Sequence, residues 1–270
     1  MTLGWKEQRV MKEVIIKDKK ICSGSTPLIS VSLMGETFEE VQNNLTNILD
    51  AAEHSRIDIV EFRGDYYKEL ENTEKLQQVL SYVSQEVKDK ILLFTIRSPR
   101  EGGIARDYSN KSIEEINRFV IDNKLADMVD VEYFSVDEGT ILIKLAKEKN
   151  VKVIMSNHDF DKTPDYDVMV ERLTKMQSLG ADVVKMAVMP KNPDDLLSLL
   201  RVTRDMKTNH NDTPVVTMSM GMMGAVSRLT GEVFGSAITF GAVGEKSAPG
   251  QIPVKELNDI LNSIHNYCVD

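Results

Sequence analysis

The sequence is poor in cysteine and in aromatic residues. Its 270 residues include two cysteines and one tryptophan, and the aromatic residues together make up 6%. Cys22 and Cys268 lie near opposite ends of the chain and form no CxxC or Cys/His spacing. Neither a disulfide framework nor a zinc site is therefore indicated. This cysteine usage fits a reducing compartment, and we expect a cytoplasmic protein.

Long apolar runs and an excess of basic residues are also missing. No 18 apolar residues run together, and the N-terminal MTLGWKEQRVMKEV lacks the apolar centre of a signal peptide, so we expect a soluble protein. The formal net charge is −9. Nucleic acids and anionic membranes are bound through an excess of lysine and arginine, so we expect neither as a partner. A small anionic substrate stays compatible, because one close cation in a desolvated pocket outweighs screened surface charges.

The composition is that of a globular protein, with 41% hydrophobic and 28% charged residues. No linker divides the chain. Residues 1–27 are expected to form an N-terminal arm, in which VIIKDKKI at 14–21 predicts a strand of a short hairpin. Residues 28–270 then alternate β-rich runs with helical patterns, as parallel sheets do. The predicted strands are 28–33, 57–63, 91–97, 126–133, 151–157, 181–188, 214–220 and 235–241.

Amphipathic helices are predicted between these strands. Thr163-Pro164 and Asn192-Pro193 each pair an N-cap residue with a proline at the first helical position, and Gly180 is placed to end the fifth helix. The predicted helices are 37–54, 72–87, 111–124, 136–149, 164–178, 193–208, 222–231 and 253–265.

Eight strand and helix units of 25 to 35 residues predict a single (β/α)8 TIM barrel, α/β in class, with a short N-terminal hairpin or arm. A doubly wound open sheet is the competing topology. It would usually carry a glycine-rich phosphate turn after the first strand, where LMGETFEE supplies one glycine.

The run ADVVKMAVMP at 181–190 carries one lysine, Lys185, inside an apolar strand. With a side-chain period of two, Lys185 shares a face with Val183 and Ala187. An edge strand whose lysine points to water is the simpler interpretation, because unpaired lysines are almost never buried. Several of the eight runs, however, carry polar groups at their carboxyl ends, where barrel active sites lie.

Charged residues end the second and third predicted strands. Glu61 and Arg63 share one face, and an ordinary structural ion pair is one interpretation of them. Arg97 ends the third strand, and Glu101 follows in SPREGG. Two arginines at neighbouring strand ends favour an anionic or carbonyl-rich ligand, because a guanidinium binds carboxylates bidentately.

The fourth and fifth strands add two carboxylates and a histidine. We interpret Asp130 and Glu132 as structural partners of nearby arginines. His158 follows the fifth predicted strand, where a neutral imidazole could move protons near pH 7. No metal-binding spacing is apparent, so a catalyst built here would need its lysine as the electrophile-forming group, through an imine with a ketone or aldehyde.

The last third of the chain holds Arg228 among small residues and a glycine and proline loop, SAPGQ, with Ser247 and Gln251. This loop is either a simple turn or a cover that closes over a ligand at the end of the barrel.

These motifs together resemble type I 3-dehydroquinate dehydratase, the Schiff-base enzyme of the shikimate pathway. The resemblance runs from about residue 12 to 265. It is carried by EFR, FTIRS with EGG, MSNHDF, KMAVMP, TMSMG, SRLTGEVFGSAITFGAV and SAPGQ. The loop IARDYSN after EGG departs from the family pattern.

The resemblance implies a role for each site residue. Lys185 matches the imine-forming lysine, His158 the general acid/base, and Glu101 the carboxylate that orients the histidine. Arg228 matches the residue that binds the substrate carboxylate. The other matches to substrate-contacting positions are Ser32, Glu61, Arg63, Arg97, Ser247 and Gln251.

The expected function is therefore dehydration of 3-dehydroquinate to 3-dehydroshikimate by syn elimination, without metal or organic cofactor, in a homodimer. Two alternatives stay open. A class I aldolase-type barrel would use the same lysine on a sugar phosphate, with Gly241, Gly244 and Gly250 as phosphate donors. A catalytically inactive barrel would serve only as a binding or regulatory module.

Overall fold

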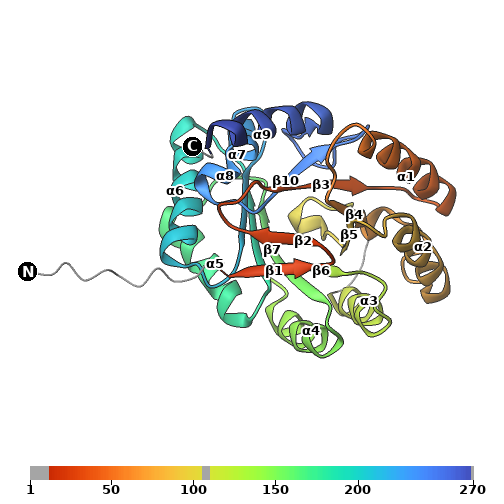
Figure 1. Cartoon of the computed structure of the whole chain (residues 1–270). Helices are drawn as coiled ribbons and strands as arrows, with labels where there is room; N and C mark the ends of the chain where they lie inside the picture. The colour runs from red at the N-terminus through yellow and green to blue at the C-terminus, as the bar shows by residue number, and fades with distance from the viewer. Residues whose placement is uncertain (1–11, 105–109, 269–270) are drawn as a thin grey trace, which may run out of the picture.

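A ring of parallel strands surrounded by helices forms the body of the protein (Figure 1). The computed structural model describes residues 12–104 and 110–268. Residues 1–11 of the predicted N-terminal arm, residues 105–109 of the IARDYSN loop and the last two residues of the predicted barrel lie outside these ranges. The ring strands are β3 (Leu28–Leu33), β4 (Ile59–Arg63), β5 (Ile91–Thr95), β6 (Met128–Glu132), β7 (Lys152–Asp159), β8 (Val183–Val188), β9 (Val215–Ser219) and β10 (Ile238–Ala242).

The order of the strands closes the barrel. Each strand from β3 to β8 pairs in parallel with the next, and β10 returns to pair with β3. The remaining neighbours are β9 and β10. A parallel bridge between Val215 and Ser236 joins them, and Ala237 N–H donates to the Val215 carbonyl at 2.8 Å. A short strand, β11 (Ile252–Pro253), adds to β10 at the rim. The predicted TIM-barrel fold is confirmed.

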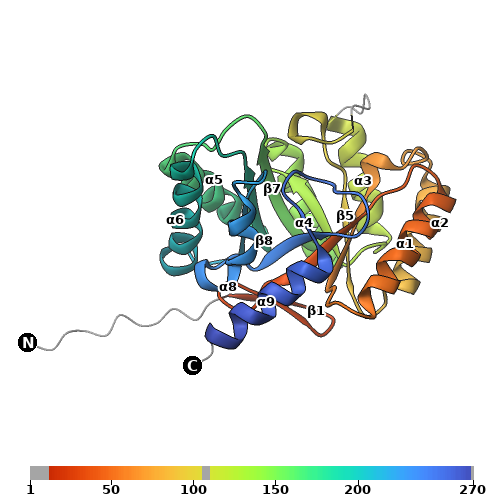
Figure 2. The ribbon, with the colours of Figure 1, turned by 90° about the horizontal axis from the view of Figure 1, so that it is seen from above.

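Helices cover the outside of the ring (Figure 2). Asn192 caps α6 by accepting a hydrogen bond from Asp195 N–H at 3.1 Å, and Gly180 ends α5 in the left-handed region, both as predicted. The described helices are α1 (Phe38–Ala52), α2 (Thr73–Glu86), α3 (Asn110–Asp122), α4 (Val136–Lys149), α5 (Tyr166–Leu179), α6 (Pro193–Asn209), α7 (Ala225–Leu229), α8 (Gly231–Phe234) and α9 (Val254–Cys268), with short 3-10 turns η1 (Gly64–Tyr66) and η2 (Pro99–Glu101).

Several predicted boundaries are wrong. Strand β5 ends at Thr95, so Arg97, predicted to end the third strand, lies two residues after it. Helix α5 starts at Tyr166 rather than at Pro164, with Asp165 as its N-cap residue. The helix predicted at 222–231 consists of two short helices, α7 and α8. Strand β7 extends to Asp159, so His158 lies inside the strand and pairs with Ala187 of β8. This extension fixes the direction of the His158 side chain more tightly than a loop would.

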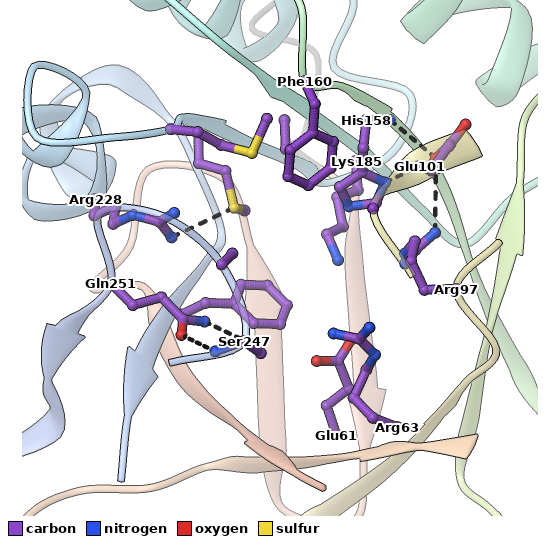
Figure 3. Close-up of a pocket in the computed structure, with 16 residues that line it drawn as sticks. Glu61, Arg63, Arg97, Glu101, His158, Phe160, Lys185, Arg228, Ser247 and Gln251 are labelled. Carbon is purple, nitrogen blue, oxygen red and sulfur yellow. Dashed lines mark hydrogen bonds and ion pairs between the residues drawn. The ribbon is translucent and has the colours of Figure 1, made fainter. Parts of the chain in front are cut away.

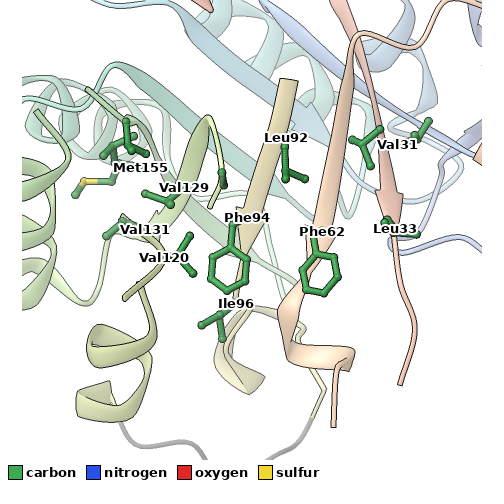
Figure 4. Close-up of a cluster of buried hydrophobic side chains, with 14 of the residues drawn as sticks. Val31, Leu33, Phe62, Leu92, Phe94, Ile96, Val120, Val129, Val131 and Met155 are labelled. Atoms are coloured by element: carbon green, nitrogen blue, oxygen red, sulfur yellow. The ribbon is translucent and has the colours of Figure 1, made fainter. Parts of the chain in front are cut away.

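Two apolar layers follow from the alternation of side chains along the strands. One lies between the ring and its helices, where Phe62, Phe94 and Met155 are completely or almost completely buried (Figure 4). The other fills the interior of the ring near the amino-terminal ends of the strands, with residues such as Ile59, Ile91 and Val216. The interior at the amino-terminal ends of the strands is thus apolar, and the polar residues that point inward lie at the carboxyl ends.

The predicted N-terminal hairpin consists of β1 (Glu13–Ile16) and β2 (Lys19–Cys22), which pair antiparallel. Residues 14–21, predicted as one strand of it, contain parts of both strands and the turn between them. Ile21 of this hairpin is fully buried in the inner layer. Lys17 Nζ lies 2.9 Å from Asp127 Oδ2 and donates to the Lys90 carbonyl at 2.6 Å, immediately before β6 and β5. The hairpin thus closes the amino-terminal end of the barrel, opposite the site (Figure 2).

Replacement of Ile21 by alanine should lower the free energy of unfolding by about 2 to 5 kcal/mol, because it leaves a cavity in a fully packed layer. Ile15 lies on the same hairpin with 59% of its surface exposed, so Ile15→Ala is the matched control and should cost less than about 0.5 kcal/mol. Denaturant unfolding of both variants measures the difference. Equal stabilities would contradict the closing role of Ile21.

Candidate active site

A cavity opens at the carboxyl ends of the strands (Figure 3). It holds about 470 Å³ of empty space, a volume that includes its open mouth. Nine of the ten residues singled out in the sequence line it, and the tenth, Ser32, bonds to two of them. The lining residues include Glu61, Arg63, Arg97, Glu101, His158, Lys185, Arg228, Ser247 and Gln251.

Lys185 projects from the middle of β8 into this cavity and is 3% exposed. Its Nζ lies 3.7 Å from Asp130 Oδ2 and 4.4 Å from the centre of the Phe240 ring. Burial lowers the pKa of Lys185 below its ordinary value, although Asp130 and Glu61 act in the opposite direction. A larger share of this lysine is consequently a neutral amine, the nucleophilic form, than of a lysine in water.

Arg97 is held by a set of carboxylates rather than left free for a ligand. Its guanidinium donates to Asp130 at 2.8 Å, to Glu132 at 3.0 Å and to the Ser156 hydroxyl at 2.9 Å. The prediction that Asp130 and Glu132 are partners of nearby arginines agrees with these contacts. Asp130 also faces Lys185, so it belongs to the site as well as to its support.

Glu101 and His158 form a hydrogen-bonded pair on neighbouring elements. Glu101 Oε2 lies 2.8 Å from His158 Nδ1 and accepts from His158 N–H at 3.0 Å. Two glycines place the carboxylate: Gly102 has φ +83°, and a Cβ on Gly103 would lie 1.8 Å from the Arg97 carbonyl oxygen. Alanine fits neither position without a shift of the backbone.

Burial changes the protonation of this pair. It raises the pKa of Glu101 to about 8, with Arg97 acting against the rise. It lowers the pKa of His158 well below the ordinary value, and Arg97 and Lys185 add to that effect. The imidazole therefore stays neutral at neutral pH, as a proton acceptor needs to be.

The Glu61 and Arg63 side chains share a face of β4, as predicted, but do not form the structural ion pair considered for them. Arg63 instead forms a bidentate pair with Asp65, with both distances 2.8 Å. Glu61 accepts from Thr95 at 3.0 Å and from Ser32 at 2.7 Å.

Arg228 has no carboxylate partner among the described residues. It is 2% exposed, donates to the Pro249 carbonyl at 3.1 Å and to Met218 Sδ at 3.6 Å, and its Nε has no hydrogen-bond partner there. Burial lowers the pKa of Arg228 to about 10. A buried guanidinium that lacks an anion is a strong indication of an anionic ligand.

The SAPGQ loop lies against the cavity and is tied to β3. Gln251 bonds both the backbone N–H and the hydroxyl of Ser247, at 2.9 and 3.0 Å, and the Ser247 hydroxyl lies 2.8 Å from that of Ser32. A Cβ on Gly250 would lie 2.3 Å from the Gly221 carbonyl oxygen. The loop is thus more than a simple turn, because it brings two polar side chains to the mouth of the site.

Several residues of the site were not singled out in the sequence. The apolar wall consists of Phe160, Ala187, Met218, Met220 and Phe240. The period of two along the predicted strands could have found Met218 and Met220 as inward residues, but nothing marks them as more than core. Asp65 follows β4 in a 3-10 turn, and its pairing with Arg63 depends on that turn.

No helix within residues 12–104 and 110–268 is long and apolar enough to cross a membrane. In the same ranges, no group of three or more histidine, cysteine, aspartate and glutamate side chains is arranged to hold a metal ion.

The fold and the cavity define an α/β barrel with a buried lysine and a histidine at the carboxyl ends of its strands. The sequence model of the family described as Type I 3-dehydroquinase matches residues 29–268. The chain belongs to that family.

Named relatives cover nearly the whole chain. The 3-dehydroquinate dehydratase of Clostridium novyi is 45% identical over 257 residues, which are 95% of this chain and 99% of the relative, and that of Bacillus subtilis is 44% identical over 94% and 98%. A crystal structure of the type I enzyme from Clostridium difficile, described with covalent modified comenic acid, is 41% identical with a TM-score of 0.89 and covers 96% and 100% of the two chains.

Replacement of Arg228 by methionine should separate binding from stability. The KM for the anionic substrate should rise about 30-fold or more, because a desolvated charge pair is worth about 2 to 5 kcal/mol. The free energy of unfolding without ligand should rise, since burial lowers the pKa of Arg228 to about 10 and the charged guanidinium is therefore a cost to the empty protein. Lys68→Met, at an exposed lysine, is the control, and an unchanged KM in Arg228→Met would remove this residue from the binding role.

Proposed function

We propose that this protein dehydrates 3-dehydroquinate to 3-dehydroshikimate through an imine on Lys185, in the cytoplasm and as a homodimer. The observation that carries the proposal is a buried amine of lowered pKa in one cavity with a neutral histidine and an arginine that lacks an anion. The names of the relatives support the reaction, and the covalent modification in the Clostridium difficile structure supports a reactive group in the family.

In the proposed reaction Lys185 forms the imine and His158 transfers the protons. The Lys185 amine attacks the substrate ketone and water leaves, which gives an iminium ion. His158 removes a proton from the carbon next to the iminium, and the electron pair forms an enamine that expels the hydroxyl group. The protonated His158 donates its proton to that hydroxyl, and a second water hydrolyses the imine, so the net change is the loss of one water.

The remaining polar residues have binding roles in this proposal. Arg228 holds the substrate carboxylate, and Glu61, Arg63, Arg97, Ser32, Ser247 and Gln251 contact the substrate directly or hold the groups that do. Because Asp65 and Asp130 already neutralise Arg63 and Arg97, Arg228 is the arginine best suited to the carboxylate. A phosphate site of the aldolase type is less well supported, since Gly241 lies within β10 and pairs with both β3 and β11.

Borohydride trapping should distinguish Lys185 from His158. Wild type incubated with 3-dehydroquinate and borohydride should gain a mass adduct on the peptide that contains Lys185. Lys185→Met should give no adduct, whereas His158→Ala should still be trapped, more slowly. His158→Ala should lose about 10² to 10⁴-fold in kcat, the usual contribution of general acid/base catalysis.

Lys191→Met, at an exposed lysine shortly after β8, is the matched control and should form the adduct as wild type does. An adduct that persists in Lys185→Met would place the imine on another lysine and contradict the proposed mechanism.

A further inference from the structure

Asn157 is a buried amide on the outer face of β7. The residues of β7 alternate, so His158 points into the barrel while Asn157 shares the face of Met155, which belongs to the outer apolar layer. Asn157 is 1% exposed. A buried amide in an apolar layer is costly unless its polar atoms have partners, and both atoms of this one do.

Arg172 fixes which way the amide points. Its guanidinium donates to Asn157 Oδ1 at 3.0 Å from helix α5. Because a guanidinium has no acceptor, the amide oxygen has to face Arg172 and the amide NH₂ has to face the other side. There Asn157 Nδ2 donates to Glu101 Oε1 at 3.2 Å.

Arg172 is itself held in place. Its guanidinium lies 5.3 Å from the centre of the Phe134 ring, in a cation–π contact. This contact gives a physical reason for an aromatic side chain that is 56% exposed. Phe134, Arg172 and Asn157 therefore form a continuous path from the surface to Glu101.

Both carboxylate oxygens of Glu101 accept hydrogen bonds. Oε1 accepts from the Asn157 amide, and Oε2 accepts from His158 N–H while it lies 2.8 Å from Nδ1. Donors on both oxygens favour the carboxylate over the neutral acid. When Glu101 is a carboxylate, the neutral His158 has to carry its proton on Nδ1, which leaves Nε2 free to accept one.

Other charges around Glu101 act in both directions. Burial raises the pKa of Glu101, and Glu132 and Asp130 of β6 add to the rise. Arg97, two residues after β5, and the Asn157 amide lower it. Lys185 of β8 and Arg63 of β4 also face the His158 side of the pair. The Asn157 amide is thus one of the groups that offset the burial of Glu101.

We propose that Asn157 and Arg172 are positioning residues that favour the ionised form of Glu101 against its burial, and that Glu101 in this form holds His158 as the Nδ1–H tautomer, ready to accept the substrate proton. This inference rests on the proposed function, because it assigns the proton transfer to His158. Neither residue lines the cavity described above, so neither is expected to contact the substrate.

Asn157→Asp is the sharpest test. The aspartate keeps the shape and the acceptor for Arg172, but it turns a carboxylate oxygen toward Glu101 in place of the NH₂ group. A like charge at this distance should move the acid limb of kcat/KM upward by about one pH unit or more. At pH 7 kcat/KM should fall about tenfold, and at pH 9 it should return to within about threefold of wild type.

Arg172→Leu frees the Asn157 amide to turn. It should move the acid limb of kcat/KM upward as well, but by a smaller amount than Asn157→Asp does. Arg118→Leu is the matched control on α3, where the arginine pairs with Glu114 on the surface, and its profile should match that of wild type. Thermal unfolding of each variant tests that the barrel is intact. A purely structural role would lower activity equally at all pH values, and that result, or an unchanged profile in Asn157→Asp, would overturn the inference.

Nitrogen NMR of His158 provides a measurement that needs no turnover. The pH at which the ring changes from Nε2–H to Nδ1–H in the empty protein should rise by about one unit in Asn157→Asp. An unchanged midpoint would overturn the inference. Absence of dehydratase activity in wild type would overturn the proposed function instead, while the tautomer measurement would still decide the role of Asn157.

Discussion

The polar end of the barrel depends on one buried carboxylate, that of Asp130. It accepts hydrogen bonds from Arg97 at 2.8 Å and from Ser156 at 2.6 Å, and it faces Lys185 at 3.7 Å. Without it, a guanidinium would be buried with a large part of its charge uncompensated, which typically costs about 3 to 5 kcal/mol. Asp130 thus makes the burial of Arg97 tolerable and limits how far burial lowers the pKa of Lys185.

The balance of buried charges explains why the site is suited to an anion. Asp65 neutralises Arg63, and Asp130 with Glu132 neutralises Arg97. Arg228 is the guanidinium in the cavity that has no such partner in the part of the chain that the structure describes. The three arginines therefore differ in role. Arg63 and Arg97 are fixed by carboxylates of the protein and contribute structure and positive potential, whereas Arg228 is available to a ligand.

The architecture was largely predictable because it depends on local patterns. The eight β-rich runs, Gly180 and the pair Asn192-Pro193 each act through neighbouring residues. The roles of the site residues came from the resemblance, and the inward faces of Lys185, Glu61 and Arg63 from the period of two. Asp130 and Glu132 were predicted as partners of nearby arginines, but the pairing of Arg63 with Asp65 could not be predicted, since it depends on the 3-10 turn after β4. The same holds for Asn157, whose two bonds reach from β7 to α5 and to the turn before Gly102.

The central claim is that burial among charged side chains prepares Lys185 to react. The ionisation of the Lys185 amine can be measured directly. Nitrogen NMR of the Lys185 amine, assigned by comparison with Lys185→Met, should give a pKa below the ordinary value of 10.5 in the protein without ligand. A value at or above 10.5 would show that Asp130 and Glu61 outweigh burial. It would contradict the view that the fold itself prepares this lysine to react with a ketone.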